Sequence, residues 1–139
     1  MVNLINKKYT IEQLEFIISE HKLEKKYWDC ICYYQVLTED FIEKYKKKLD
    51  WCCLCQCQKM SEPFLKKHLR DISWDHLLDF NRVSVDFIIK HIKKIPQRSL
   101  IIAIENYPIP KYELLKLLAN DWGTEHFKNR FLKVLKNSK

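Results

Sequence analysis

Four of the six cysteines lie between Trp51 and Gln58, and they are the first candidates for metal or redox chemistry. Their order, Cys-Cys-x-Cys-x-Cys, would spread the sulfurs around the circumference of one short helix. A structural zinc site needs four ligands about 2.3 Å from one centre, often as Cys-x2-Cys pairs. We therefore expect no metal and no cofactor, and interpret these cysteines as small apolar side chains. Zinc binding and regulatory thiol chemistry are the alternatives.

A repeat of 23 residues surrounds this stretch, because Trp28, Trp51 and Trp74 are evenly spaced. Matched columns follow each tryptophan: an aliphatic residue (Ile31, Leu54, Leu77), an amide (Gln35, Gln58, Asn81), a hydroxyl (Thr38, Ser61, Ser84), a phenylalanine (Phe41, Phe64, Phe87) and a lysine (Lys44, Lys67, Lys90). The cysteines occupy apolar columns, with Cys55 aligned to Cys32 and Leu78, and Cys57 aligned to Tyr34 and Phe80. Cys53 shares a column with Cys30 and His76, but equivalent positions on packed helices lie about 8–10 Å apart, too far for one zinc ion.

Each unit predicts a short helix, a tight turn and a second helix. Thr38, Ser61 and Ser84 precede amphipathic runs, as helix N-caps do. The apolar spacing i, i+1, i+4, i+5 of those runs is typical of one helix face. Such a unit is too small to bury its own apolar stripe, so neighbouring units must stack. The sequence therefore predicts an all-α fold, an α-solenoid of helix-turn-helix repeats with terminal capping helices.

The whole chain, 1–139, is expected to form a single domain. Its predicted divisions are an N-terminal cap (1–27), three repeats (28–50, 51–73, 74–97), a degenerate repeat (98–120) and a C-terminal capping helix (121–139). Thr10 and Gln13 form a capping box at the first helix. The residues expected to face inward are Leu14, Phe16, Ile17 and Ile18 in the N-terminal cap, and Phe127, Phe131, Leu132 and Leu135 in the last helix.

The stretch from Trp28, Trp-x-x-Ile followed by Gln-x-Leu-Thr-Glu-Asp-Phe-Ile-Glu-Lys, resembles short helical repeats found in uncharacterised proteins of giant DNA viruses and large phages. The resemblance covers about residues 28–94. It implies a helical repeat array and a viral or phage origin, but no activity.

Composition excludes several function classes. The chain has one glycine, whereas phosphate-cradling loops and dinucleotide-binding motifs need several. Every apolar run is interrupted by charge before the roughly 20 residues needed to cross a membrane, and we expect a cytoplasmic protein, in the host cytoplasm if viral. No acid pair or nucleophile–base pattern is recognisable, and His68 and His91 are interpreted as core or inter-repeat residues. We therefore expect no enzyme.

The expected function is protein–protein interaction. If the chain is viral, the expected partner is a host protein and the expected role is counter-defence. Candidate contact residues are Tyr33, Gln56 and Asp79, which lie in a variable outward column, and the lysines at the ends of the second helices (Lys44, Lys67, Lys90, Lys93, Lys94). The net charge of +7 leaves open a nucleic-acid-binding array that uses the lysine edge. A structural or self-assembling protein is the second alternative. The amide column is expected to satisfy backbone groups between repeats. Trp51→Ala should cost about 3–5 kcal/mol if that tryptophan is buried.

Overall fold

The computed structural model describes residues 2–80, 83–106, 110–119 and 123–137, and throughout these ranges the regular structure is helical, without a β-strand. The α-helices, in chain order, are α1 (Ile11–Glu20), α2 (Lys25–Tyr34), α3 (Glu39–Tyr45), α4 (Trp51–Cys57), α5 (Glu62–Lys67), α6 (Trp74–Phe80), α7 (Val85–His91), α8 (Gln97–Asn106), α9 (Lys111–Ala119) and α10 (Glu125–Asn137), and a short 3-10 helix, η1 (Ile92–Lys94), follows α7. The predicted all-α class is confirmed.

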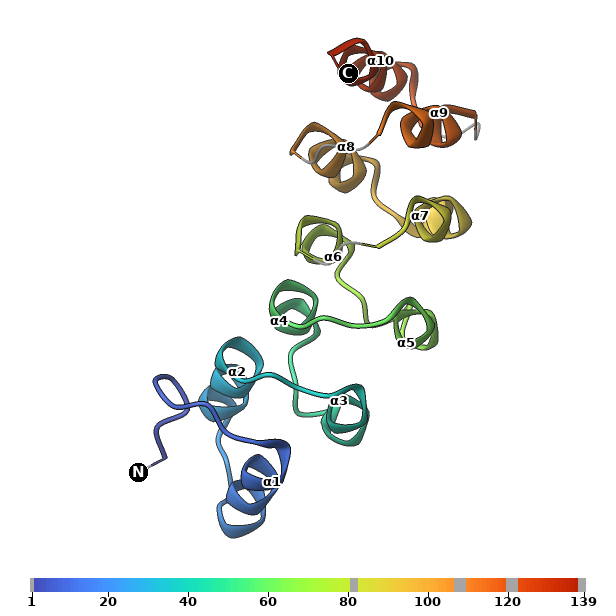
Figure 1. Cartoon of the computed structure of the whole chain (residues 1–139). Coiled ribbons are helices and arrows are strands. Elements are labelled where there is room, and N and C mark those ends of the chain that lie inside the picture. The colour runs from blue at the N-terminus through green and yellow to red at the C-terminus, as the bar shows by residue number, and fades with distance from the viewer. Residues whose placement is uncertain (1, 81–82, 107–109, 120–122, 138–139) are drawn as a thin grey trace.

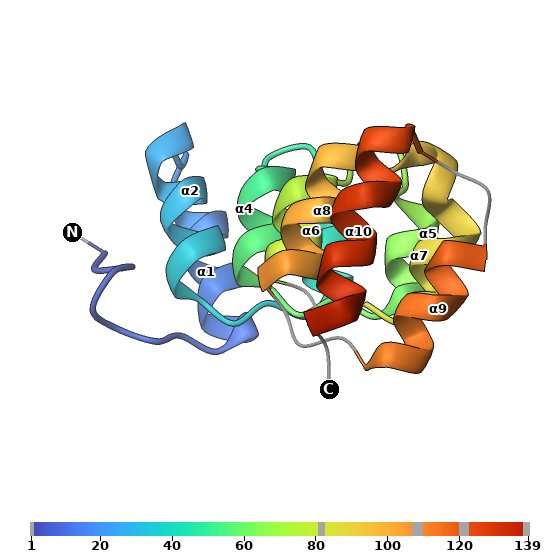
Figure 2. The ribbon, with the colours of Figure 1, turned by 90° about the horizontal axis from the view of Figure 1, so that it is seen from above.

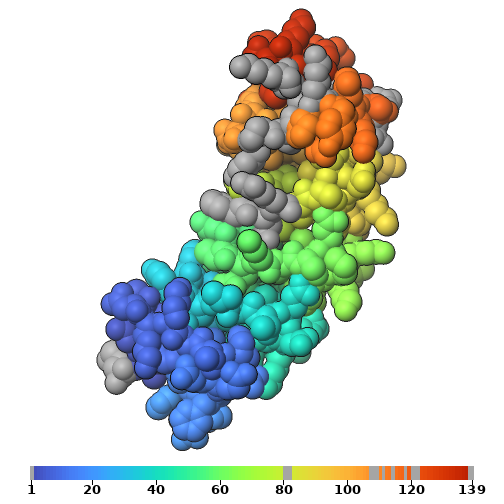
Figure 3. All heavy atoms as spheres, viewed as in Figure 1, coloured from blue at the N-terminus to red at the C-terminus, as the bar shows by residue number. Residues whose placement is uncertain are grey.

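Successive helices alternate between two layers (Figure 1). Helices α2, α4, α6, α8 and α10 form the first layer, in which each helix packs against the next. Helices α3, α5, α7 and α9 form the second layer, and α1 lies at its N-terminal end. Seen from above, the helices of each layer lie behind one another (Figure 2). The body is therefore long, and colour runs in sequence order from one end to the other (Figure 3).

Hydroxyl caps begin the second-layer helices α3, α5 and α7, as the sequence predicts. The backbone N–H of Phe41, three residues into its turn, donates to Thr38 Oγ1 at 3.2 Å. The equivalent bonds reach Ser61 Oγ at 3.3 Å and Ser84 Oγ at 3.1 Å. The capping box at Thr10 is also confirmed, with both of its hydrogen bonds present. Each cap satisfies an N–H group that the helix itself leaves without a partner.

The core follows the repeat columns. Ile31, Leu54 and Leu77 are fully buried on the first layer, and the phenylalanine column of the second layer is buried opposite them. Trp28 and Trp74 are also buried, but Trp51 is only partly buried. The cost of about 3–5 kcal/mol predicted for Trp51→Ala assumed a buried ring. It is therefore too high for this partly buried tryptophan.

Two residues expected to face inward are exposed, and both lie in terminal helices. Phe16 is 66% exposed and Leu132 is 39% exposed, while Leu14, Phe127 and Phe131 are buried as expected. A terminal helix has a neighbour on one side only, so it buries a narrower stripe than an internal helix. In α1, Leu14 is buried and Ile17 and Ile18 are partly buried, which turns Phe16 to the open side.

None of the helices in the described ranges is both long and apolar enough to span a membrane. Helix α2 begins at Lys25, three residues before the predicted boundary at Trp28. Below, the ranges 28–50, 51–73 and 74–97 are called unit 1, unit 2 and unit 3. The contact of unit 1 with unit 2 is the first joint, and that of unit 2 with unit 3 is the second joint.

Candidate functional sites

The amide column ties consecutive units together through backbone groups. Gln58 Nε2 donates to Cys32 O and to Gln35 O, both at 2.8 Å, and its Oε1 accepts from Leu37 N at 3.0 Å. One buried side chain thus provides hydrogen-bond partners for two carbonyl groups at the C-terminal end of α2 and for one N–H group of the turn that follows it. The predicted structural role is confirmed for Gln35 and Gln58, whereas Asn81 lies outside the described residues.

The segment before α1 forms the same three hydrogen bonds with Gln35 that the end of α2 and its following turn form with Gln58. This similarity was not predicted from the sequence. Gln35 Nε2 donates to Leu4 O at 2.7 Å and Lys7 O at 2.9 Å, and Gln35 Oε1 accepts from Tyr9 N at 2.9 Å. These acceptors and this donor have the same spacing as the three groups bound by Gln58. A sequence offset of 28 residues, in place of 23, aligns Leu4 with Cys32 and Thr10 with Thr38, and that offset is the signal that could have found it.

A glutamate at the start of the second-layer helix forms another bond across each joint. Glu39 Oε1 accepts from Ser61 N at 2.6 Å in the first joint, and Glu62 Oε1 accepts from Ser84 N at 2.6 Å in the second. Each bond holds the N-cap residue of the next helix in place. The two joints therefore have the same backbone attachment.

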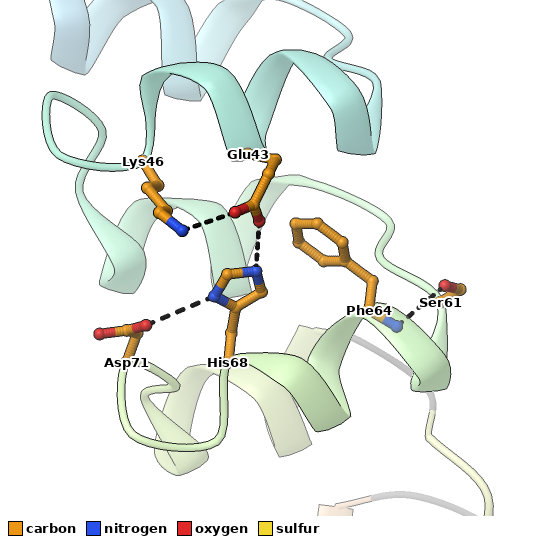
Figure 4. Close-up of polar contacts among 6 residues, drawn as sticks. All are labelled: Glu43, Lys46, Ser61, Phe64, His68 and Asp71. Carbon is orange, nitrogen blue, oxygen red and sulfur yellow. Dashed lines mark hydrogen bonds and ion pairs between the residues drawn. The ribbon is translucent and has the colours of Figure 1, made fainter.

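The histidine of the first joint is surrounded by acidic groups. His68 is 6% exposed and its Nε2 lies 2.7 Å from Glu43 Oε2, while Nδ1 lies 3.5 Å from Asp71 Oδ2. Glu43 also accepts from Lys46 Nζ at 2.5 Å, so its carboxylate bridges the imidazole and the ammonium (Figure 4). Lys46 first, and His68 after it, hold the pKa of Glu43 below its ordinary value. The Trp51 ring packs on the imidazole, with ring centroids 4.8 Å apart.

The histidine of the second joint has the opposite electrostatic surroundings. His91 is 8% exposed, and no described group forms a hydrogen bond with its Nε2. Burial, together with Lys94, Lys90 and Lys66, lowers the pKa of His91. The repeat frame aligns Lys66 with Glu43 and Lys94 with Asp71. The sequence shows this replacement of acidic residues by lysines. It was not predicted, because the repeat was defined by its apolar and capping columns alone.

The cysteine cluster is arranged for packing. Cys32, Cys53 and Cys55 are buried, and none of the six cysteines forms a disulfide bond. Burial raises the pKa of Cys32 to about 12 and that of Cys55 to about 11, which disfavours the reactive thiolate. The apolar interpretation is thereby confirmed for Cys32 and Cys55. It is wrong for Cys57, which is exposed, because its column faces outward in unit 1 as well, at Tyr34.

The described residues contain no group of three or more His, Cys, Asp or Glu side chains placed to hold a metal ion. One hollow of about 420 Å³ lies between α2 and the turn before α4 and is lined by both lysines and aspartates, Lys25, Lys47 and Lys48 with Asp29 and Asp50 among them. A second hollow, of about 300 Å³, lies beside Asp75, Asp79 and Arg98. The second hollow is also lined by Ser99, whose hydroxyl donates to Asp75 Oδ1, and Ser99 itself is buried.

The candidate contact residues fall on different layers. Tyr33, Gln56 and Asp79 lie on α2, α4 and α6 of the first layer, where Tyr33 is 47% exposed and the other two are half-buried. The lysines lie on the second layer, on α3, α5, α7 and η1, and all are exposed (Lys44, Lys67, Lys90, Lys93, Lys94). Lys44 pairs with Glu15 at 2.7 Å. The two sets of candidate residues therefore lie on separate layers of the structure.

Four large apolar side chains around the C-terminal end of α2 are exposed, of which only Tyr33 was predicted, and together they are called the apolar patch. Its members are Ile5, Tyr33, Tyr34 and Val36, and Val36 is 77% exposed. The N-terminal segment crosses the end of α2 here, because Lys8 Nζ donates to Tyr34 O and Gln35 binds Leu4 O. The Tyr33 hydroxyl interacts with the Cys53 thiol, which raises the pKa of Tyr33 to about 12. That contact fixes a ring whose face stays in solvent.

The chain matches no protein-family model, no curated protein and no solved structure. Its function must therefore be argued from its own residues.

Proposed function

We propose that the chain is an α-solenoid whose repeats form a non-enzymatic protein-interaction module, and that a partner protein binds the apolar patch formed by Ile5, Tyr33, Tyr34 and Val36. The alternation of the helices between two layers, and the hydrogen bonds repeated at each joint, support the solenoid arrangement. The observation that carries the binding proposal is the patch itself.

Large exposed apolar side chains that gather in one place mark contact surfaces, whereas singly scattered ones do not. Tyrosine is enriched at the centre of protein interfaces because its ring contributes large contact area at small cost in conformational entropy. The two tyrosine rings are neighbours, with centroids 6.3 Å apart. The expected occupant is a protein surface with exposed aliphatic or aromatic groups, and its identity as a host protein would follow from the viral resemblance.

The test compares two variants with the wild-type protein in affinity capture from a nuclease-treated lysate. Tyr34→Ser with Val36→Ser removes two of the four patch side chains, including Val36, the most exposed of them. Lys67→Gln with Lys90→Gln changes the opposite layer. The proposal expects the same protein to be captured by the wild type and by the lysine variant, and lost with the patch variant. Capture that survives the patch variant contradicts it.

Two further outcomes would redirect the function. Capture that occurs only in a parallel lysate without nuclease, and that the lysine variant loses, would favour a nucleic-acid-binding array. A mass in solution that rises with concentration, and falls in the patch variant, would assign the patch to self-association.

A further inference from the structure

His91 has a buried polar atom that lacks a partner. Its Nε2 is buried, because the side chain belongs to the inward column that also holds Tyr45 and His68. Buried imidazole nitrogens are normally hydrogen-bonded, because losing water without gaining a partner is unfavourable. No group within the described ranges fills this role, so the atom calls for an explanation.

The first joint shows what occupies the equivalent place. There the carboxylate of Glu43 lies between His68 Nε2, at 2.7 Å, and Lys46 Nζ, at 2.5 Å. The Glu43 side chain is 47% exposed, so a carboxylate on a largely solvated stem reaches this buried nitrogen. Figure 4 shows that the carboxylate approaches the imidazole from the neighbouring second-layer helix.

The second joint keeps the imidazole and replaces both acidic groups. Lys66 stands where Glu43 stands one unit earlier, and Lys94 stands where Asp71 stands. Both lysines are exposed, and no ion pair with a described acidic group involves either of them. In the first joint Glu43 contacts His68 Nε2, whereas Asp71 lies beside Nδ1. The repeat frame therefore places Lys66 on the side of the unpartnered His91 Nε2 and Lys94 on the side of Nδ1.

We propose that the second joint is a carboxylate-binding site, in which an aspartate or glutamate side chain of a partner protein binds His91 Nε2 and the ammonium group of Lys66, with Lys94 adding positive charge beside the ring. The bound carboxylate would lie between α5 and α7, as Glu43 lies between α3 and α5. This site is on the second layer, so it goes beyond the apolar patch of the proposed function and does not depend on it.

The place that Glu43 occupies in the first joint is taken in the second by Lys66, which is exposed to solvent. Lys66 leaves an exposed helix end on a flexible four-carbon stem, and its ammonium can close on an anion after the anion has entered. A carboxylate is the oxyanion of choice because the first joint shows that one fits this geometry. Charge complementarity acts in the same direction, since Lys90 adds a third positive group on α7.

Binding would be coupled to the protonation of His91. The charged groups acting on this imidazole are Lys94 of η1, Lys90 of α7 and Lys66 of α5. The acidic group on α7, Asp86, is 83% exposed and lies 3.9 Å from Lys116 of α9. An added carboxylate would stabilise the imidazolium and raise the titration midpoint of His91.

The experiment follows the ring-proton resonances of His91 and His68 by NMR during pH titrations, in sodium acetate and in sodium chloride of the same ionic strength. The expected result is a higher midpoint for His91 in acetate, with His68 unchanged, because Glu43 already occupies the equivalent place there. An equal His91 midpoint in the two salts overturns the proposal. A larger rise with inorganic phosphate than with acetate overturns the assignment to a carboxylate.

Two variants make the result specific. Lys66→Glu supplies the missing carboxylate from the chain itself, so the His91 midpoint should rise without acetate and stop responding to it. Lys67→Gln removes a neighbouring charge and should leave the acetate response intact. Loss of the response in Lys67→Gln, or a Lys66→Glu protein that responds as the wild type does, contradicts the site. Because neither variant alters the apolar patch, failure here would leave the proposed function standing.

Discussion

His68 and His91 occupy the same column of consecutive units, and their surroundings are opposite in charge. Each imidazole is buried against a phenylalanine one turn earlier, with ring centroids 4.7 Å apart in both units. His68 lies between Glu43 and Asp71, whereas His91 is surrounded by lysines and keeps an unpartnered Nε2. The comparison teaches that the repeat conserves packing and backbone attachment, while the polar edge of each joint is free to differ.

The largest effect should come from the tryptophans that cover the two imidazoles. Trp74 is buried, with its centroid 6.3 Å from the ring of His91, and Trp51 is only partly buried against His68. We expect Trp74→Ala to lower the free energy of unfolding by about 3–5 kcal/mol, and Trp51→Ala by about 2 kcal/mol, because less contact is lost there. Urea unfolding of both variants measures the difference. An equal cost would mean that the two joints are packed alike.

This pair also shows how far the sequence could be read. The 23-residue columns predict the paired helices of each unit, the hydroxyl caps and the buried aliphatic and phenylalanine columns, because period and capping chemistry are local. They do not distinguish Trp51 from Trp74, since the exposure of each ring depends on neighbours from other units. Phe16 and Leu132 were wrongly predicted to face inward, because periodicity alone does not show where the stack of helices ends. The hydrogen bonds between the N-terminal segment and Gln35 were not predicted, because that segment aligns with unit 1 at an offset of 28 residues and not 23.

The backbone attachment common to both joints gives the next test. Glu39 and Glu62 each accept one hydrogen bond from the N–H of the next unit's cap residue, at the same distance of 2.6 Å. We expect Glu39→Ala and Glu62→Ala to lower the free energy of unfolding by about 1 kcal/mol each, because an ionised acceptor is lost at a partly solvated place. Chemical denaturation should give costs that agree within experimental error. A clear inequality would show that the attachment itself differs between the joints.

The histidines should differ when each is replaced by the similarly shaped phenylalanine. His68→Phe removes the partner of Glu43 and should cost about 1 kcal/mol, the usual net value of a hydrogen bond. His91→Phe removes an atom without a partner, so its effect on the free energy of unfolding should be near zero or stabilising. Thermal unfolding of the two variants at pH 7.5 checks the order. A larger loss of stability in His91→Phe than in His68→Phe would mean that His91 has a strong hydrogen-bond partner in solution.

The smallest effect is the pH dependence that His91 gives to stability. Its pKa lies below the ordinary value of 6.5, chiefly because burial disfavours the imidazolium and then because the lysines repel it. As pH falls below 6.5, the unfolded chain takes up a proton that the folded chain resists, so the free energy of unfolding decreases through that window. His91→Phe should therefore lose less stability than the wild type between pH 7.5 and pH 5.5, as measured by the urea midpoint. Tyr45→Phe, in the same column of unit 1, removes no imidazole and should keep the wild-type dependence. The carboxylate of Glu43 does not disturb this window, because its pKa is lowered from 4.5 and its contribution is lost only in more acidic solution. If His91→Phe and the wild type lose equal stability, then the lysines and burial do not act on His91 in solution, and the contrast between the two joints is one of packing alone.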